Sequence, residues 1–411
     1  MVAYLVAGLA FGDEGKGATT DALVRHFGAN LVIRYNGGAQ CAHNVVSPDG
    51  KHHTFAQFGS GTFVPGVRTY LSRFVLVNPV SLMIEEENLR QVGVTDAFDR
   101  LYVDRQAVVI TPYQRSLNRL QELSRGKQRH GSTGMGIGVA REDHLKYGDS
   151  VLMVRDLCNP KTAKDKLEWS RTLCKERAAA LTLDGSNMSM QRELGCLYSP
   201  TTTFWYLDKY AQFCRRVMMA YEPPSQYSRL VFEGAQGMML DETHGLQPHT
   251  TWSDITFHNA DVLLNEMSFM GDIHRVGVLR AYYTRHGAGP LPSEDRELQR
   301  EINTVEIHNK GEEYTGAFRV GAFDIGLALY GLHCISGVDS LAINHVDVIN
   351  GLGYAPVRLP SGEMTRWGVA RFLNELPDIL ETPISMIGEG LSFEDREFYP
   401  ENLNGVRPCQ N

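Results

Sequence analysis

The sequence predicts an α/β fold: a large, mostly parallel sheet flanked by helices, with a nucleotide site like that of P-loop NTPases and a helical insertion. Three observations lead to this prediction. The chain opens with a strand, a glycine-rich loop, a helix and a second strand, which favours parallel strands with helices on both faces. Short apolar runs follow, and one long segment has helical spacing instead. At 411 residues the length suggests two or three domains or one large α/β domain with lobes, and because no repeat or low-complexity tract is visible we assign residues 1–411 to a single domain.

The elements are expected in the following order. Residues 2–9 predict a buried strand because V-A-Y-L-V-A-G-L is apolar throughout, residues 17–27 predict a helix, and residues 31–35 predict a second strand. Residues 160–222 carry Lys, Glu, Arg, Leu and Ala at helical spacing, and we assign residues 156–228 to a helical lobe within the domain. Further strands are expected from the apolar runs at residues 74–77, 101–103, 107–110, 229–232, 275–280 and 341–349.

Composition argues against several classes of protein. Hydrophobic residues make up 43% of the chain and charged residues 21%, which is typical of a globular protein and unlike a disordered one. The formal net charge of -8 argues against a nucleic-acid partner, although a local pocket can still be positive. No apolar run approaches the roughly 18 residues of a membrane span. The seven cysteines include no C-x-x-C pair, which favours a reducing, cytoplasmic setting.

The first loop, G-D-E-G-K-G at residues 12–17, lies between the first strand and the first helix. Glycines there let backbone N–H groups approach a phosphate, and Lys16 would neutralise phosphate oxygens. The loop departs from a Walker A sequence, because Ala10 and Gly17 stand where that motif has Gly and Ser or Thr. Asp13 and Glu14 are unexpected beside an anion unless a carboxylate binds Mg²⁺ or takes a proton. The loop therefore predicts a catalytic or metal-binding Asp13, the alternative being a tight surface turn.

The second loop, R-Y-N-G-G-A-Q-C-A-H at residues 34–43, should open at the same edge of the sheet, where α/β proteins bind ligands. Its His43 is a candidate general acid, whereas Cys41 reads as a packing residue because nothing nearby would activate it. The third loop, G-S-T-G-M-G-I-G at residues 131–138, predicts either a second phosphate nest or a flexible hinge.

Four further polar loops follow at residues 232–237, 283–290, 314–319 and 344–347. The last of them carries Asp347 after an apolar run. Such an Asp usually caps a helix. In a nucleotide site it can instead accept the N1–H and the amino hydrogens of guanine.

Taken in this order, the loops resemble those of the adenylosuccinate synthetase family. The shared motifs are G-D-E-G-K-G, R-Y-x-G-G-x-x-x-x-H, T-G-x-G-I-G, F-E-G-A-Q-G, T-R-x-G-A-G-P and x-D-V-x-x-G, spread from Gly12 to about Gly390. The resemblance implies a ligase that joins the amino group of aspartate to C6 of a 6-oxopurine nucleotide, normally IMP. It implies GTP and Mg²⁺, a 6-phosphoryl intermediate, and a cytoplasmic homodimer with small-molecule substrates.

Carried over by position, the resemblance assigns roles to single residues. Asp13 would remove the N1 proton and meet Mg²⁺ together with the Ala42 carbonyl, and His43 would support phosphoryl transfer to O6 as an acid. The nucleoside triphosphate would contact Gly12, Glu14, Gly15, Lys16, Gly17, Asp347 and Gly390. The purine nucleotide would contact Gln40, Thr133, Gln236 and Thr251, and the aspartate carboxylates would contact Thr315 and Arg319.

The chain departs from the family pattern around the substrates. Gln40 occupies the position of an Asn that binds the IMP phosphate in the family. Met135 occupies the position of an Arg, and Ala317 that of the first arginine after Thr-Gly. The arginine that reaches the neighbouring subunit is absent, and Lys146 or Arg141 are its candidate substitutes. The catalytic pair Asp13 and His43 is thus kept, whereas several substrate-binding groups are replaced or missing. This pattern favours a divergent paralogue with a changed substrate over an inactive enzyme.

Three alternatives remain open. A phage-type relative acts on dGMP, makes the 2-aminoadenylosuccinate deoxynucleotide and suggests ATP or dATP as energy donor. It typically lacks the Asp of the first loop, so Asp13 speaks partly against it. A phosphotransferase for a small acceptor would not need Thr315 and Arg319 to hold a dicarboxylate, and a non-catalytic nucleotide sensor would not need Asp13 and His43.

Overall fold

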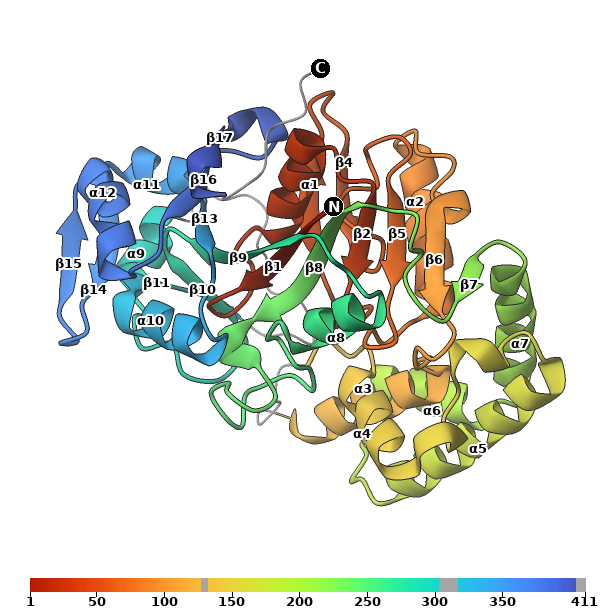
Figure 1. The fold of residues 1–411 in the computed structure, drawn as a ribbon. Helices are drawn as coiled ribbons and strands as arrows, with labels where there is room; N and C mark the ends of the chain where they lie inside the picture. Colours follow the sequence, from red (N-terminus) through yellow and green to blue (C-terminus); the bar gives the residue numbers. More distant parts are fainter. Residues whose placement is uncertain (127–131, 303–316, 404–411) are drawn as a thin grey trace.

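A ten-stranded sheet forms the centre of the molecule (Figure 1). The computed structural model describes residues 1–126, 132–302 and 317–403. Neighbouring strands pair in parallel except β16 and β17, so the expected large, mostly parallel sheet is confirmed. In spatial order the strands are β17 (Arg396–Phe398), β16 (Ile384–Gly388), β13 (Ser340–Asn344), β9 (Asp272–Arg280), β1 (Val2–Gly8), β8 (Arg229–Gly237), β2 (Leu31–Arg34), β5 (Arg68–Leu71), β6 (Leu101–Asp104) and β7 (Met218–Ala220).

Strand β1 lies between β8 and β9, and all of its residues are buried. Its side chains alternate between two cores: Tyr4 and Val6 pack on the side of α1 (Lys16–Phe27), and Leu5 and Ala7 pack on the opposite side. Because both faces of a central parallel strand are covered, the sequence is apolar throughout and does not alternate.

Other helices and three small sheets surround the large sheet. The helices are α2 (Pro79–Gln91), α8 (His258–Glu266), α9 (Arg296–Ile302), α10 (Ile325–Cys334), α11 (Val346–Leu352) and α12 (Val369–Ile379). The small sheets pair β3 (His43–Val46) with β4 (His52–Phe55), β10 (Tyr283–His286) with β11 (Phe318–Gly321), and β14 (Ala355–Arg358) with β12 (Phe323–Asp324) and β15 (Met364–Trp367).

A helical lobe lies at one end of the molecule, at the lower right of Figure 1. It contains α3 (Pro112–Ser124), α4 (Ile137–Tyr147), α5 (Pro160–Ala179), α6 (Met188–Tyr198) and α7 (Pro200–Cys214). Leu117, Leu167, Leu197 and Tyr210 join these helices in one core with β5 and β6. The helical segment expected within residues 156–228 corresponds to α5–α7, and β7 at its end belongs to the large sheet.

Two of the predicted strands were wrong, and a third was too long. Residues 74–77 and 107–110 form only isolated bridges, such as that between Val77 and Val109, and the strand of this region is β5. The run at 341–349 ends as a strand at Asn344, because His345 adopts a left-handed conformation (φ 61°) and α11 begins at Val346. Apolar runs this short do not distinguish a strand from a buried helix.

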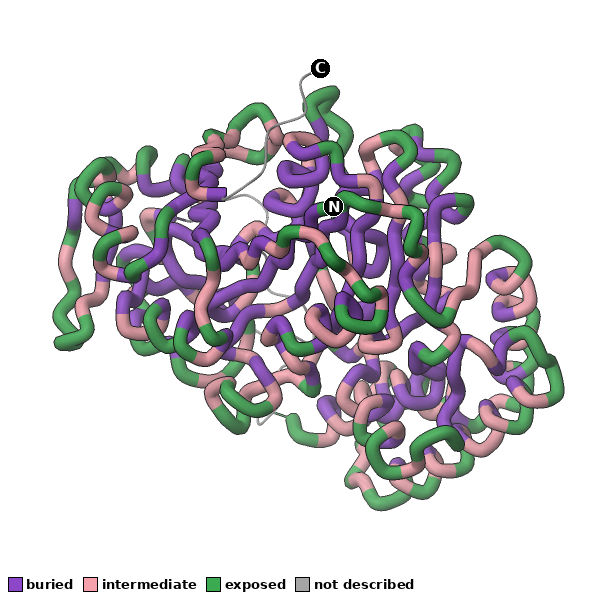
Figure 2. Tube along the Cα trace, in the orientation of Figure 1, coloured by how far each residue is buried: buried purple, intermediate pink, exposed green. Residues whose placement is uncertain are grey.

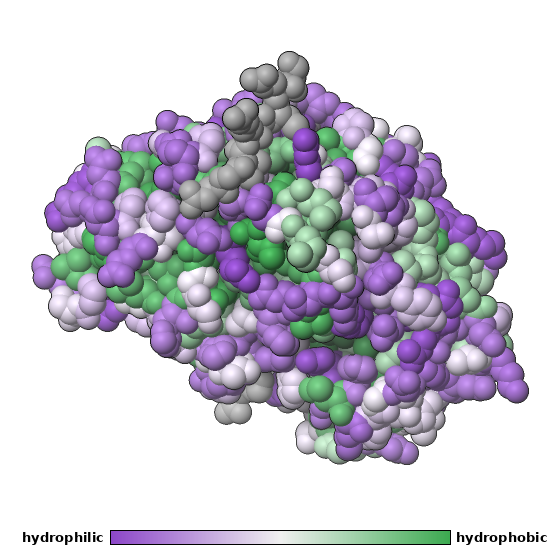
Figure 3. Space-filling model, in the orientation of Figure 1, coloured by the Kyte–Doolittle hydropathy of each residue, from purple (hydrophilic) through white to green (hydrophobic). Residues whose placement is uncertain are grey.

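Burial follows the sheet closely. In Figure 2 the buried residues run along the central strands, whereas loops and outer helical turns are exposed. Figure 3 shows hydrophilic residues over most of the same face, with smaller hydrophobic areas between them. Across the described ranges, no helix combines the length and the apolar character that a membrane crossing requires.

Candidate active site

The carboxyl ends of the central strands meet at one edge of the sheet, and glycines let the loops that follow them pack closely. A Cβ at Gly17 would lie 2.6 Å from the Cβ of His43, so only glycine lets the first loop approach the second this closely. A Cβ at Gly15 would lie 2.9 Å from the Asn344 side chain. The first loop therefore meets the second loop, as the sequence predicts, and also the end of β13.

Glu14 fills the interior of the first loop. Its side chain is fully buried and accepts hydrogen bonds from the backbone N–H groups of Ala10 (3.0 Å) and Gly12 (2.8 Å). The other carboxylate oxygen pairs with Lys16 Nζ at 2.5 Å. Since the carboxylate is enclosed, Glu14 can contact a nucleotide only through its backbone, and Lys16 must exchange this partner to reach a phosphate.

Asp13 points away from this interior. Its backbone is left-handed (φ 57°), and its carboxylate Oδ2 lies 3.0 Å from His286 Nε2 at the end of β10. Desolvation alone would raise the pKa of Asp13. The hydrogen bond from His286 and the charges of Arg280 and Lys16 outweigh it and hold the pKa below its usual value. Asp13 is therefore ionised at neutral pH and able to accept a proton or a cation.

The surroundings of Asp13 fit a hard divalent cation. Its ionised carboxylate keeps 36% of the side-chain surface exposed beside a loop suited to phosphate. In proteins Mg²⁺ is usually held by one or two carboxylates together with substrate phosphate oxygens and water. Over the described part of the chain, His, Cys, Asp and Glu do not gather in threes as a metal cage would need. Asp13 thus suits a cation shared with a phosphate ligand, and Ala42 could add only its backbone carbonyl.

His43 is oriented by a buried carboxylate. Its Nδ1 lies 2.5 Å from Glu233 Oε1 on β8, and Ser60 donates its backbone N–H to Glu233 Oε2 at 2.9 Å. Desolvation together with the nearby cations lowers the pKa of His43, although Glu233 opposes the shift. Because Glu233 fixes the proton on Nδ1, the ring presents Nε2 to a substrate.

Two half-buried glutamines, Gln40 and Gln236, have enclosed side-chain amides without hydrogen-bond partners in the described structure. Gln236 also has a left-handed backbone (φ 63°), a strained conformation for a residue with a side chain. An enclosed amide without partners costs free energy, which indicates that both side chains form their hydrogen bonds with a bound ligand.

The third loop joins the same region. A Cβ at Gly38 would lie 2.9 Å from Ile137 Cδ1 at the start of α4, and a Cβ at Gly138 would lie 3.1 Å from the Trp252 ring. Thr133 is exposed just before this helix, and Thr251 donates to the Leu240 carbonyl from its hydroxyl at 2.9 Å.

The far side of the first loop is bounded by β13 and β16. Asn344 donates its amide to the Glu14 carbonyl at 2.9 Å and accepts from Arg396 at 2.8 Å. Burial lowers the pKa of Arg396 to about 10. Asp347 is exposed in the first turn of α11, and Gly390 follows β16 next to Asp395.

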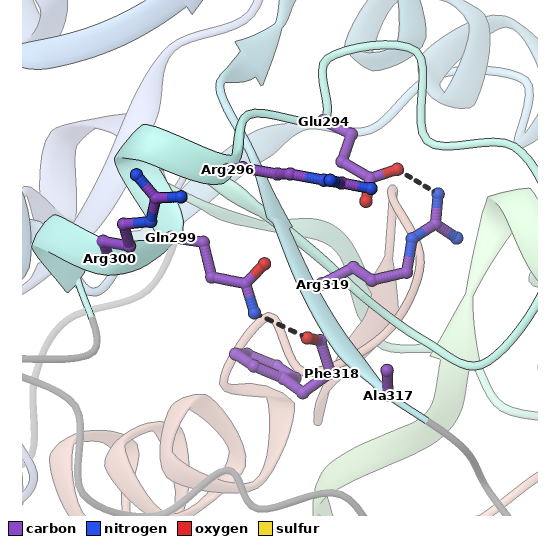
Figure 4. Close-up of a pocket in the computed structure, with 7 residues that line it drawn as sticks. All are labelled: Glu294, Arg296, Gln299, Arg300, Ala317, Phe318 and Arg319. Carbon is purple, nitrogen blue, oxygen red and sulfur yellow. Dashed lines mark hydrogen bonds and ion pairs between the residues drawn. The ribbon is translucent and has the colours of Figure 1, made fainter.

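Arg319 lies on β11, beside a cavity of about 450 Å³ (Figure 4). Its guanidinium donates to the carbonyls of Gly287 (3.2 Å) and Gly289 (2.7 Å) and also pairs with Glu294. Thr315, the other expected aspartate contact, lies outside the described residues.

Sequence reasoning gave no role to Glu233, His286, Arg280 or Arg396. The first two lie within motifs that the sequence singled out, F-E-G-A-Q-G and T-R-H-G-A-G-P, so the signal was present. Arg280 and Arg396 each lie at an end of a strand with no motif around them, and only the fold brings them to the first loop.

Comparisons with known proteins agree with this geometry. The family profile described as Adenylosuccinate synthetase matches residues 5–358. An adenylosuccinate synthetase of Microcystis aeruginosa is 34% identical over 99% of this chain and 96% of its own length. One from Paraburkholderia phytofirmans is 31% identical over 85% of this chain and 76% of its own length.

Two solved structures share the fold. The fully ligated adenylosuccinate synthetase of Plasmodium falciparum has a TM-score of 0.77 at 20% identity, covering 96% of this chain and 99% of that one. The succinoaminodeoxyadenylate synthetase of cyanophage S-2L, bound to dGMP and to dATP as an energy donor, has a TM-score of 0.57 at 15% identity, covering 98% and 96%.

Proposed function

The chain belongs to the adenylosuccinate synthetase family and is a ligase that forms C–N bonds, and from this premise we propose that it converts IMP, GTP and L-aspartate to adenylosuccinate, GDP and phosphate. The observation that carries the proposal is the ionised Asp13 carboxylate, held by His286 beside a phosphate-type loop. A carboxylate there has no use in binding phosphate alone, but it serves a reaction that must remove a proton from the purine.

In the first half-reaction, Asp13 takes the N1 proton of the purine. The electrons left behind move to O6, which attacks the γ-phosphorus of GTP while GDP leaves. In this proposal the approaching phosphates favour a second proton on His43, at Nε2. The ring then donates from Nε2 to the negative charge that grows on the transferred group, while Glu233 balances the charge of the protonated ring. Lys16 turns from Glu14 to the phosphates.

Mg²⁺ belongs to the same proposal, with Asp13 and the Ala42 carbonyl as its protein contacts. When bound, it would neutralise charge on the β- and γ-phosphate oxygens. In the second half-reaction, the amino group of aspartate displaces the 6-phosphate, and Arg319 holds a carboxylate of the amino acid. Gln40, Gln236, Thr133 and Thr251 are proposed to hold the purine nucleotide.

The nucleoside triphosphate is proposed to lie between the first loop and the ends of β13 and β16. Asp347 and Gly390 would contact its purine base. A homodimer in the cytoplasm is part of the proposal and rests on the family alone.

A second candidate acceptor is dGMP. The observation that favours it is Ala317, which stands where the family's first arginine after Thr-Gly would be and cannot donate to a ribose 2′-hydroxyl. A site without such a donor discriminates weakly against deoxyribose. The cyanophage relative, whose structure contains dGMP, lends the candidate weight.

The test is a matrix of substrates. The protein is incubated with Mg²⁺, aspartate, either GTP or ATP, and one of IMP, dIMP, GMP and dGMP, and the products are identified by mass. Asp13→Asn is run beside it as a control for contaminating activity. Phosphorylated acceptors without aspartate adducts would favour a phosphotransferase, and nucleotide binding without any product would favour a sensor.

A further inference from the structure

A second arginine shares the cavity beside β11 with Arg319. Arg296 extends from the start of α9, and in Figure 4 its guanidinium and that of Arg319 approach the carboxylate of Glu294. Arg319 forms an ion pair with Glu294, and the charge of Arg296 also acts on it. The hydrogen bond from Arg319, together with both positive charges, holds the pKa of Glu294 below its usual value despite desolvation. Arg319 therefore binds this ionised carboxylate directly, and Arg296 acts on it through its charge.

Backbone contacts fix these groups in place. Glu294 bridges to Gly321 on β11, and Asp295 donates its N–H to the Val320 carbonyl at 3.0 Å. The Asp295 side chain then accepts from the N–H of Glu297 at 2.8 Å in the first turn of α9. Because the backbone next to Arg296 is tied to the strand of Arg319, their relative position is set by the fold.

The cavity adjoins the proposed reaction site. Phe318 lines it, and the Phe318 ring lies 5.2 Å from the His286 ring, centroid to centroid. His286 in turn contacts Asp13 at 3.0 Å. A molecule in the cavity is thus separated by two rings, those of Phe318 and His286, from the carboxylate that acts on the purine.

The nearby arginines differ in how much of their hydrogen bonding is already used. Arg285 donates to the carbonyls of Ala288, Pro290 and His249, and burial lowers its pKa to about 10. The Arg296 side chain is exposed, and its guanidinium makes no hydrogen bond with the described residues. Of the two, Arg296 is the one whose guanidinium can still donate hydrogen bonds to a new carboxylate.

We propose that Arg296 and Arg319 together bind a carboxylate of the amino acid substrate at the place that Glu294 occupies. Glu294 pairs with Arg319 and lies within the electrostatic reach of Arg296, and the substrate must displace it, so Glu294 lowers the affinity for a dicarboxylic amine. Arg296 then supplies a cation that the arginine-poor run at residues 317–320 lacks. This inference rests on the proposed function, since it takes aspartate as the amine.

Three variants test it. Arg296→Met removes the added cation, Glu294→Gln removes the competing carboxylate, and Arg300→Met is the matched control. Arg300 lies one turn further along α9, and its guanidinium points away from Glu294 in Figure 4. Steady-state kinetics give KM for aspartate, KM for both nucleotides and kcat. Calorimetry with aspartate and with succinate measures dicarboxylate binding without turnover.

Arg296→Met should raise KM for aspartate about ten- to a hundredfold, the range expected for a lost charge-assisted hydrogen bond, and leave KM for the nucleotides unchanged. Glu294→Gln should lower KM for aspartate about twofold to fivefold, as for removal of an exposed competing charge. Arg300→Met should change it less than about twofold.

Equal effects of Arg296→Met and Arg300→Met would overturn the proposal, because general electrostatics would then explain both. A higher KM in Glu294→Gln would show that Glu294 supports the site and does not compete. If the wild type forms no aspartate adduct, the proposed function fails, and calorimetry still decides the inference. Dicarboxylate binding that Arg296→Met weakens supports it, and binding that is absent or unaltered refutes it.

Discussion

Replacing Glu233 with Gln should slow phosphoryl transfer much more than it weakens nucleotide binding. Glu233 is fully buried and accepts hydrogen bonds on both carboxylate oxygens: Oε1 from His43 Nδ1 at 2.5 Å and from the Ser60 hydroxyl, and Oε2 from the Ser60 backbone at 2.9 Å. A glutamine keeps the volume but has a donor on one terminal atom, so it cannot accept at both positions. It also removes the charge that balances a protonated His43.

The size of the effect follows from what the substitution leaves intact. A positioned acid or base contributes about 10²–10⁴-fold to rate, and the imidazole itself remains, so we expect a loss of about 10²-fold in kcat. Arg34 on β2 is the register partner of Glu233 on β8, the charge of each acts on the pKa of the other, and Arg34 is only 2% exposed. Leaving this cation without its counter-charge costs up to about 3 kcal/mol, so the variant should also melt at a lower temperature.

The assay compares Glu233→Gln, His43→Ala and the double variant, measuring GDP release and KM for both nucleotides. Glu85→Gln is the matched control, because Glu85 is a buried carboxylate that accepts from the backbone of Ala56 and Gln57 at 2.9 Å and has no hydrogen bond to His43 in the described structure. If Glu233 acts through His43, the double variant should be about as slow as His43→Ala. Additive losses, or a kcat in Glu85→Gln as low as in Glu233→Gln, would refute the reasoning.

The remaining predictions concern single groups and pH. Asp13→Asn should lower kcat about 10²–10⁴-fold with little change in GTP affinity, and near wild-type turnover would remove Asp13 from the mechanism. Arg319→Leu should raise KM for aspartate about tenfold or more, and unchanged aspartate dependence would place the amine elsewhere. Burial and nearby cations hold the pKa of His345 well below 6.5, so its contribution to folding is present above the unfolded pKa and falls as pH drops through it. At a pH one unit below the unfolded pKa, the loss of folding free energy is about 1.4 kcal/mol. Thermal melts of the wild type and of His345→Asn over a pH series measure it. Equal pH dependence of the two melting temperatures would contradict the prediction. With Ala317 unable to donate to a 2′-hydroxyl, kcat/KM for IMP and dIMP should differ by less than about a hundredfold.

The sequence predicted the parts of the site that are continuous in the chain. Asp13 and Lys16 were recognisable because glycines surround them after a buried strand, and His43 because it ends a second loop of the same kind. The partners of these residues were not recognisable. Glu233 is 190 positions from His43, and no local pattern reports a contact of that separation.

The errors in the predicted strands also arise from contacts that a local sequence pattern does not report. The apolar run after Asn344 reads as one strand, but His345 takes a left-handed conformation that ends the strand and starts α11. Strand β5, with Arg68 and Thr69, was missed because it is too short and too polar to stand out, although its pairing with β2 buries it. In both cases tertiary packing decided the local structure.

The first loop resolves the question of why two carboxylates stand where phosphate should bind. Glu14 accepts the N–H groups of Ala10 and Gly12, so it stabilises the loop from inside as a phosphate would from outside. Asp13, one residue earlier, turns outward in a left-handed conformation and meets His286. The adjacent carboxylates therefore differ in role because the backbone sends them in opposite directions. Only the outward one is available to a substrate, so a loss of activity in Glu14→Gln should come with a loss of stability, whereas Asp13→Asn should separate the two.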